Sequence, residues 1–365
     1  MNAGAPPRIM IIGPLPPPLH GAAVITAMVA EAVAVRNKVI LLNIAPSGMQ
    51  RGLAYHWTRV RRVMAAMVRV AASGFGAKRG AIYLSAAGGR GLLYNVTLAV
   101  GARLLNRPLY IHHHSFAYID RRDWKMALLA WVAGTRACHL ALCSTMELGL
   151  RRNYRRATHV RVLSNAAFYA PPANPISPRA SGSRLRLGFL SNLHRDKGLD
   201  LVVDTALAAG DTAAALVLAG DPMNVDAEAL IAAARAKLGP RFDYRGAVRG
   251  GDKTRFFSDI DVFLFPSRYV NEAEPTVVYE AMSAGVPVIA YGRGCIPCQV
   301  PEGAGLVIPP GGDFVSAACA QIERWTRDPA AWTLASRKAI EATRIAHEQA
   351  RAGLMELVAA LERPR

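Results

Sequence analysis

The chain has 365 residues, more than one hydrophobic core usually supports, so two domains are expected. Its content of 52% hydrophobic and 19% charged residues excludes a disordered protein. The net charge of +18 favours anionic partners such as phosphorylated ligands, acidic lipid surfaces or nucleic acid, although a compositional bias toward Ala and Arg would also produce it. The sequence shows neither a signal peptide nor an uncharged stretch of 18 apolar residues, so we expect an intracellular protein without a transmembrane helix.

The first half alternates between short apolar runs and helical stretches. The run 8–13 ends at Gly13 and predicts a buried parallel strand, followed by a proline-rich loop over 14–21 and a helix over 22–35. Further strands are expected at 39–44, 81–85, 109–113 and 140–144. This alternation predicts a doubly wound, Rossmann-like α/β domain over residues 1–172.

Residues 51–70 have the pattern of a basic amphipathic helix. One reading is a helix that docks on an anionic membrane, and the other is a helix that packs on its own sheet with a solvated basic face. We favour the membrane slightly. The predicted apolar face consists of Val60, Val63, Met64, Met67 and Val68, and the basic face of Arg59, Arg62 and Arg69.

Residues 170–183 are rich in proline and serine without periodicity and predict a linker. Strand signals then return at 185–190, 215–219, 261–265 and 286–290, with a strand-like piece at 244–248. They predict a second Rossmann-like domain over 184–344. The helical stretch 329–363 ends the chain, and its part from about 345 is expected to pack on the first domain. Two such domains in tandem are expected to face an interdomain cleft.

Two patterns in the second half point to a ligand. Arg195 and Lys197 lie between a strand and a helix, where basic groups and free backbone N–H groups suit a phosphate, although a solvated basic turn has the same pattern. Glu272 and Glu280 stand eight positions apart around Pro275, an arrangement that suits a ligand with many hydroxyl groups. The alternative is a helix cap at Glu280 and a surface Glu272.

Histidine and cysteine patterns do not predict a metal site. His112 and His114 share one face of a strand and His113 takes the other, but no carboxylate or cysteine partner is evident nearby. Cys295 and Cys298 form a lone C-x-x-C without a second pair or spaced histidines. We therefore expect no metal and no cofactor.

Several signals follow one another in a fixed order in the second half of the sequence. They are the basic loop, the glycine strand end at 217–220, the Pro-Ser strand end at 266–267, the paired glutamates and Gly285-Val-Pro-Val-Ile289. This order resembles the second domain of retaining glycosyltransferase family 4, the "group 1" glycosyltransferases of GT-B fold. The E-x7-E signature of that family matches Glu272 to Glu280. The resemblance is strong over about 185–315 and looser in the first domain. It implies an α/β GT-B fold and a nucleotide-sugar donor as co-substrate.

The resemblance also implies roles for individual residues. Glu280 resembles the glutamate that binds the donor ribose, and Glu272 the catalytic-site glutamate that faces the donor sugar. Lys197 and Arg195 resemble a pyrophosphate clamp. His114, with His113 as the alternative, resembles a histidine that binds the donor sugar, and Gly21, beside His20, lies where a glycine loop approaches the phosphates. The remaining donor-site candidates are Asn192, Ser267, Ala273, Glu274 and Pro275.

The sequence departs from the family at two places. The usual Gly-Arg before the lysine is Ser191-Asn192, so Asn192 or Arg195 would replace the clamp arginine. The Phe-Gly after the first glutamate is replaced by Ala273-Glu-Pro275.

The expected activity is retaining transfer of a sugar from a UDP- or GDP-sugar to a glycan or lipid-linked acceptor in cell-surface polysaccharide or glycolipid synthesis. The expected location is the cytoplasm, with peripheral contact to the inner face of the cell membrane. The alternatives are a non-catalytic nucleotide- or nucleic-acid-binding subunit and a sugar-nucleotide epimerase or hydrolase. No recognisable nucleic-acid motif is present, so nucleic acid is not expected as a partner.

Overall fold

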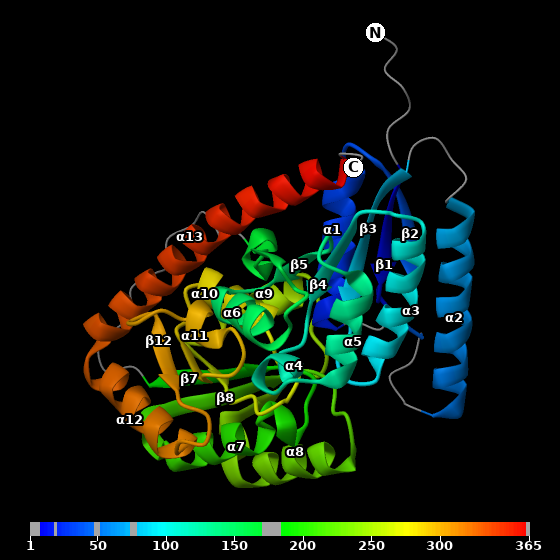
Figure 1. Cartoon of the computed structure of the whole chain (residues 1–365). Coiled ribbons are helices and arrows are strands. Elements are labelled where there is room, and N and C mark those ends of the chain that lie inside the picture. The colour runs from blue at the N-terminus through cyan, green and yellow to red at the C-terminus, as the bar shows by residue number, and fades with distance from the viewer. Residues whose placement is uncertain (1–7, 18–19, 47–51, 74–78, 170–183, 363–365) are drawn as a thin grey trace. The chain divides into compact units, whose positions relative to one another are not determined.

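The computed structural model describes residues 8–17, 20–46, 52–73, 79–169 and 184–362. The chain divides into two compact units: unit 1 comprises Met1–Phe168 and Gln349–Arg365, and unit 2 comprises Tyr169–Glu348 (Figure 1). The predicted linker at 170–183 lies outside the described residues. Each unit is built around one parallel six-stranded sheet, which confirms the expected α/β fold of two Rossmann-like domains.

The sheet of unit 1 has the strand order β2-β1-β3-β4-β5-β6. The order reverses between β1 and β3, which makes this the topological switch point of the sheet. The strands are β1 (Arg8–Gly13), β2 (Lys38–Asn43), β3 (Arg79–Ala86), β4 (Leu109–His113), β5 (Cys138–Ala141) and β6 (His159–Val162). The helices are α1 (Gly21–Ala34), α2 (Leu53–Ala72), α3 (Gly91–Leu104), α4 (Ala117–Asp120), α5 (Trp124–Ala133) and α6 (Ser144–Asn153), with a 3-10 turn at Asn165–Phe168.

The sheet of unit 2 has the order β12-β11-β10-β7-β8-β9, so its switch point lies between β7 and β10. The strands are β7 (Leu185–Leu190), β8 (Ala213–Ala219), β9 (Phe242–Tyr244), β10 (Val262–Phe265), β11 (Val288–Tyr291) and β12 (Gly305–Ile308). The α-helices are α7 (Leu199–Ala208), α8 (Val225–Leu238), α9 (Gly251–Ser258), α10 (Thr276–Ser283), α11 (Ile296–Gln299), α12 (Phe314–Arg327) and α13 (Pro329–Glu362). Short 3-10 turns lie at Arg195–Lys197, Gly210–Thr212 and Gly239–Arg241.

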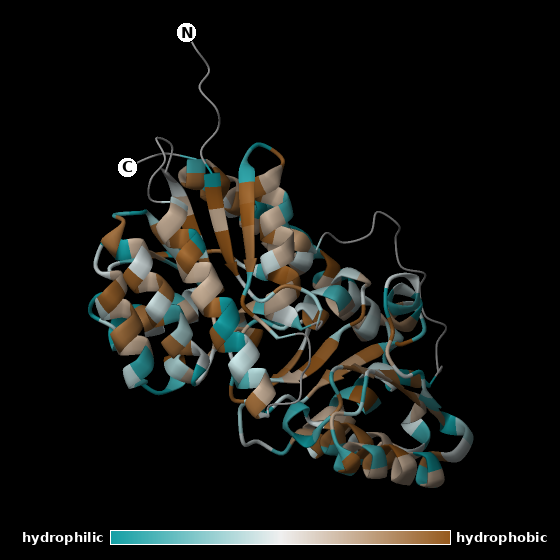
Figure 2. Cartoon of the chain, turned by 90° about the vertical axis from the view of Figure 1, so that its right-hand side faces the viewer, coloured by the Kyte–Doolittle hydropathy of each residue, from teal (hydrophilic) through white to brown (hydrophobic). Residues whose placement is uncertain are grey.

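The strands form because they are apolar on both faces. Every residue of β4, β10 and β11 is buried, as expected for parallel strands that are covered from both sides. Figure 2 shows the strands largely in the apolar colour, whereas the helices mix apolar and polar residues. This patterning is what made most strands predictable from the sequence.

Several predicted boundaries differ from the structure. The strand expected at 140–144 is β5, which ends at Ala141 because Ser144 already begins α6. The strand-like piece at 244–248 is wrong beyond Tyr244, where β9 ends, and Gly246 has a positive φ of 63° in the following loop. The strands β6 and β12 were not predicted. Each lies at the edge of its sheet and buries only one of its four residues, so it lacks the fully buried pattern of a central parallel strand.

The long helix α13 begins in unit 2, and its residues from Gln349 onward belong to unit 1. There, the Tyr110 hydroxyl donates to the carbonyl of Ala360 at 3.3 Å, and the amide of Asn37 donates to Glu362 at 3.0 Å. The end of the helix therefore contributes to the packing around the first sheet.

The faces of α2 differ from those predicted. Val63, Ala66 and Val70 are buried, whereas Val60, Met64 and Val68 of the predicted apolar face are exposed. Arg59 and Arg62, placed on the solvated face by the sequence, are half-buried instead. The reason is that the small residue Ala66 allows the helix to pack on its alanine and valine side.

Candidate functional site

The loop after β7 carries the basic residues singled out in the sequence. It turns through Arg195–Lys197 and reaches α7 through Gly198, which has a positive φ of 86°. A Cβ atom on Gly198 would lie 2.3 Å from the carbonyl oxygen of Pro266, which follows β10. Because only glycine fits this contact, the loop after β7 packs closely on the end of β10, at the switch point of the sheet.

This packing brings Lys197, Ser267 and Glu272 together. The Lys197 Nζ lies 2.6 Å from Oε2 of Glu272, and the Ser267 hydroxyl donates to the same oxygen at 2.6 Å. The Lys197 ammonium also lies 4.7 Å from the centre of the Tyr269 ring. The Lys197 and Glu272 side chains are only 16% and 9% exposed. The result is a compensated charge pair, largely removed from water, at the place where open α/β sheets bind ligands.

Arg195 does not join this pair. Its guanidinium donates to Asp226 at 2.8 Å and lies 3.6 Å from Asp200. The hydrogen bond to Asp226 raises the pKa of Arg195. Arg268 holds the loop from the other side, since it donates to the carbonyl of Arg195 and to Asp200, both at 2.7 Å. Lys197 and Arg195 therefore point to different partners in this structure.

Glu280 forms a second charged pair in unit 2. It lies on α10, and the Lys253 Nζ, from α9, lies 2.5 Å from its Oε2. This oxygen is buried and has no hydrogen-bond partner in the described part of the chain, so we describe the contact with Lys253 as an ion pair and not as a hydrogen bond. Tyr169 stacks on Tyr279. Burial, together with the charge of Glu280, raises the pKa of Tyr169 to about 12.

The segment between the two glutamates is fixed by its backbone. The N–H of Cys295 donates to the carbonyl of Ala273 at 2.7 Å, and the Gln299 side chain donates to the carbonyl of Pro275 at 3.2 Å. Glu274 is buried and accepts a hydrogen bond from Tyr279 at 2.9 Å. Asn192 is half-buried in the loop after β7. Glu274 thus has a structural partner of its own, on the helix that carries Glu280.

In unit 1, Gly21 is the first residue of α1. The imidazole of His20 caps this helix by accepting the N–H of Ala23 at 3.3 Å, and burial, with the charge of Arg59, lowers the pKa of His20. A Cβ atom on Gly21 would meet no atom within 4 Å. The chain itself therefore does not require glycine at this helix start.

The three consecutive histidines have different environments. His113 uses both ring nitrogens, one with the Tyr118 hydroxyl and one with Nδ1 of His139, each at 2.9 Å. The ring of His114 lies 4.2 Å from that of His112, and its Nε2 has no hydrogen-bond partner among the described residues. Burial holds the pKa of His114 well below its ordinary value. His114 thus has a buried ring nitrogen without a hydrogen-bond partner among the described residues, whereas both ring nitrogens of His113 are used.

The residues described by the structure contain no group of three or more His, Cys, Asp or Glu that could hold a metal ion. Within those same residues, no helix is long and apolar enough to cross a membrane.

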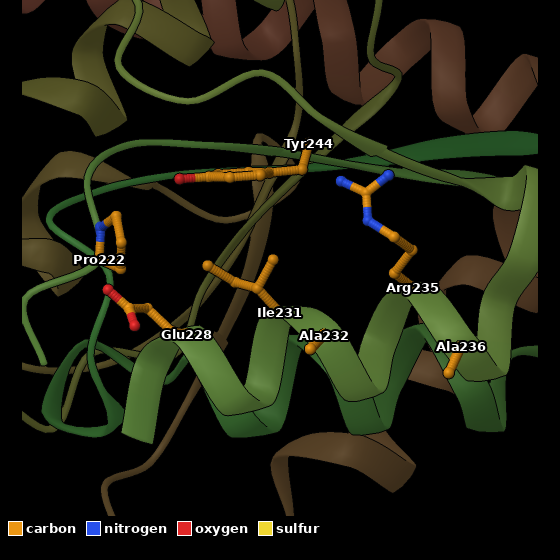
Figure 3. Close-up of a pocket in the computed structure, with 7 residues that line it drawn as sticks. All are labelled: Pro222, Glu228, Ile231, Ala232, Arg235, Ala236 and Tyr244. Atoms are coloured by element: carbon orange, nitrogen blue, oxygen red, sulfur yellow. The ribbon is translucent and has the colours of Figure 1, made fainter. Parts of the chain in front are cut away.

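A hollow of about 470 Å³ lies beside the edge strand β9. Figure 3 shows Glu228 beside Pro222 at one end, Arg235 at the other, and the Tyr244 ring facing Ile231. None of the residues predicted for the site lines it, so we assign it no role. Its lining consists of Pro222, Glu228, Ile231, Ala232, Arg235, Ala236 and Tyr244.

The sequence did not indicate Lys253, Tyr169, Tyr269 or Arg268. Lys253 lies in the first turn of a short helix, shortly after Gly250 and Gly251, and Arg268 and Tyr269 follow the Pro-Ser strand end. These three residues lie where a loop meets a helix or a strand meets a loop, at the carboxyl edge of the sheet. That position was the only feature of the sequence that could have pointed to them as site residues.

Comparison with known proteins agrees with this geometry. Residues 184–328 match the family described as "Glycosyl transferases group 1". None of the curated proteins matches the sequence. Among solved structures, the chain is similar to HepE of Anabaena in complex with UDP-glucose, with a TM-score of 0.71 and 17% identity over 97% of this chain and 99% of that chain.

Two further structures have the same fold. Sucrose-phosphate synthase from Thermosynechococcus elongatus gives a TM-score of 0.74 and 19% identity, again over 97% of this chain and 99% of that one. The apo form of WaaB, a lipopolysaccharide outer core galactosyltransferase, gives 0.65 and 14% over 95% of this chain and 99% of that one. At these identities the likeness shows the fold alone.

The chain therefore has the GT-B fold of glycosyltransferases. Residues 184–328 match the group 1 glycosyltransferase family, which confirms the resemblance inferred from the glutamate pair. Membership of family 4 within this group stays a prediction.

Proposed function

We propose that the protein is a retaining glycosyltransferase that moves a sugar from a UDP- or GDP-sugar to a glycan or lipid-linked acceptor in cell-surface polysaccharide or glycolipid synthesis. The observation that carries the proposal is the Lys197–Glu272 pair with Ser267 at the switch point of a group 1 domain. The structure of HepE with UDP-glucose supports a nucleotide-sugar donor, and the likeness to the galactosyltransferase WaaB supports sugar transfer.

In this proposal, Lys197, Glu272 and Glu280 each contact a different part of the bound donor. Lys197 leaves Glu272 and neutralises the donor phosphates as the bond between sugar and phosphate breaks. Glu272, still held by Ser267, accepts hydrogen bonds from the donor sugar, and Glu280 accepts them from the ribose. His114 contributes its free Nε2 to the sugar. Positioning and electrostatic stabilisation, rather than a protein nucleophile, provide the catalysis.

The acceptor binds on unit 1, and the protein works in the cytoplasm beside the inner face of the cell membrane. No cofactor or metal takes part beyond the donor itself.

The test is a nucleotide-sugar panel in a thermal-shift assay, followed by incubation of the best donor with candidate acceptors. We expect stabilisation by one uridine or guanosine sugar nucleotide and a product with the anomeric configuration of the donor, measured by NMR. An inverted product would overturn retention. Lack of stabilisation by every sugar nucleotide would overturn the proposed donor site.

A further inference from the structure

The outward side of α2 carries a continuous apolar stripe. We call it the outer stripe: Leu53, Trp57, Val60, Met64 and Val68. Their spacing of three or four residues places them on one side of the helix. Leu53 is 91% exposed, and Trp57 and Val68 are each 65% exposed. Single exposed apolar side chains are common, but a helix-long row that includes a tryptophan marks an interaction surface.

The outer stripe is not needed for the core of unit 1. The opposite side of α2 already buries Val63, Ala66 and Val70. Met67 contacts α3, where its Cε would lie 3.1 Å from a Cβ added at Gly101. In Figure 1, α2 lies on the outer side of α3, and Figure 2 views the chain from this side. One face of α2 thus packs on the rest of unit 1, and the outer stripe on the other face is exposed to solvent.

The charge of the protein is concentrated in the unit that carries this stripe. Residues 1–168 contain 22 of the 44 Lys and Arg but only four of the 26 Asp and Glu, whereas the rest of the chain contains 22 of each. The first part therefore holds the whole excess of 18. Neither α2 nor α3 contains an Asp or Glu.

Two arginines of α2, Arg61 and Arg69, are exposed. At 3.6 residues per turn, Arg61 borders the outer stripe, and Arg69 lies farther around the helix, beyond Val68. By contrast, Arg62 donates to the carbonyl of Ala45, and the Arg59 guanidinium lies 4.9 Å from the centre of the Tyr94 ring. Of the basic face expected from the sequence, only Arg69 is therefore exposed, and the second exposed arginine of α2 is Arg61.

We propose that the outer stripe of α2 is a docking surface for an anionic lipid bilayer, with α2 lying in the plane of the interface. A helix of 20 residues is about 30 Å long, and its apolar side chains reach the acyl boundary while Arg61 and Arg69 meet lipid phosphates. A second copy of the chain fits less well, because symmetric contact would bring two equally basic faces together.

The experiment is co-sedimentation of the full chain with vesicles of equal parts phosphatidylcholine and phosphatidylglycerol, and with phosphatidylcholine alone. We expect binding to the anionic vesicles that weakens with salt. The double variant Trp57→Ser, Met64→Gln should bind at least about tenfold more weakly, because apolar burial is lost. Arg61→Gln and Arg69→Gln should each reduce binding roughly fivefold.

Leu148→Gln is the matched control, since Leu148 is 68% exposed on α6 of the same unit but lies off the stripe. It should bind like the unchanged protein, and all variants should keep the same unfolding temperature. Absence of binding to anionic vesicles, or full binding by the double variant, would overturn the proposal. If the protein does not bind lipid but self-associates, and the double variant abolishes that self-association, the occupant of the outer stripe would be a second copy of the chain and not a bilayer. Vesicle binding does not depend on the donor site, so its failure is separable from failure of the proposed activity.

Discussion

Lys197 and Glu272 are 75 positions apart in the sequence, yet their charged atoms lie 2.6 Å apart. The contact exists because β7 and β10 are neighbours in the sheet, so the loops that follow them share one edge. The pair places a cation and a carboxylate at the switch point of unit 2.

The first prediction concerns this pair. Lys197→Met and Glu272→Gln should each lower the free energy of unfolding by about 3 kcal/mol, because each leaves a nearly buried polar group without its partner. The double variant should lose less than the sum, with a coupling of about 1–3 kcal/mol. Urea unfolding measures all three, and Lys237→Met, exposed on α8, is the control. Strict additivity would mean that the two groups do not interact in solution.

The second prediction tests the ribose contact proposed for Glu280 separately from general stability. Glu280→Ala should weaken UDP or GDP binding roughly 10- to 100-fold, because a charged hydrogen bond contributes about 1.5–3 kcal/mol. The affinity for the matching 2′,3′-dideoxy nucleotide should stay the same, as measured by calorimetry. Glu302→Ala, at an exposed position, is the control. An equal loss for both nucleotides would assign Glu280 to another role.

The third prediction follows from the buried histidines of unit 1. Burial lowers the pKa of His139 to about 4 and that of His112 to about 3, from an ordinary value of 6.5. Between pH 6.5 and 4 the unfolded chain therefore binds protons that the folded chain does not, so stability falls as the pH falls. Each such histidine contributes a slope of about 1.4 kcal/mol per pH unit.

His139→Gln should remove about one such contribution while keeping a polar partner for His113. The slope is measured by urea unfolding at several pH values between 6.5 and 4. His159→Gln changes an exposed histidine of the same unit and should leave the slope as it is. The same result from both variants would contradict the assignment.

The fourth prediction compares two glycines with positive φ. A Cβ atom on Gly220, with φ of 124°, would lie 1.7 Å from the carbonyl oxygen of Ser191, whereas one on Gly246, with φ of 63°, would meet no atom within 4 Å. Gly220→Ala should cost more than about 3 kcal/mol of stability and weaken donor binding, since Ser191 begins the loop that carries Lys197. Gly246→Ala should cost only about 1–2 kcal/mol. Thermal unfolding and nucleotide titration compare the two, and equal effects would show that the close contact does not matter.

The sequence by itself determined the two α/β units, because continuous apolar runs and glycine strand ends are local signals that survive without coordinates. It also singled out Lys197, Ser267, Glu272 and Glu280, since each belongs to a short motif that can be read from neighbouring residues in the sequence. It could not determine which basic group meets which carboxylate, because that depends on strand order.

Only the tertiary structure paired Lys197 with Glu272, turned Arg195 toward Asp226, and placed Lys253 against Glu280. It likewise decided which side of α2 is buried, because a helix whose valines and methionines form one broad face can pack by either edge of that face. Contacts between residues that are distant in the sequence decide these pairings and the buried face of α2. A single amino-acid sequence does not show which distant residues meet.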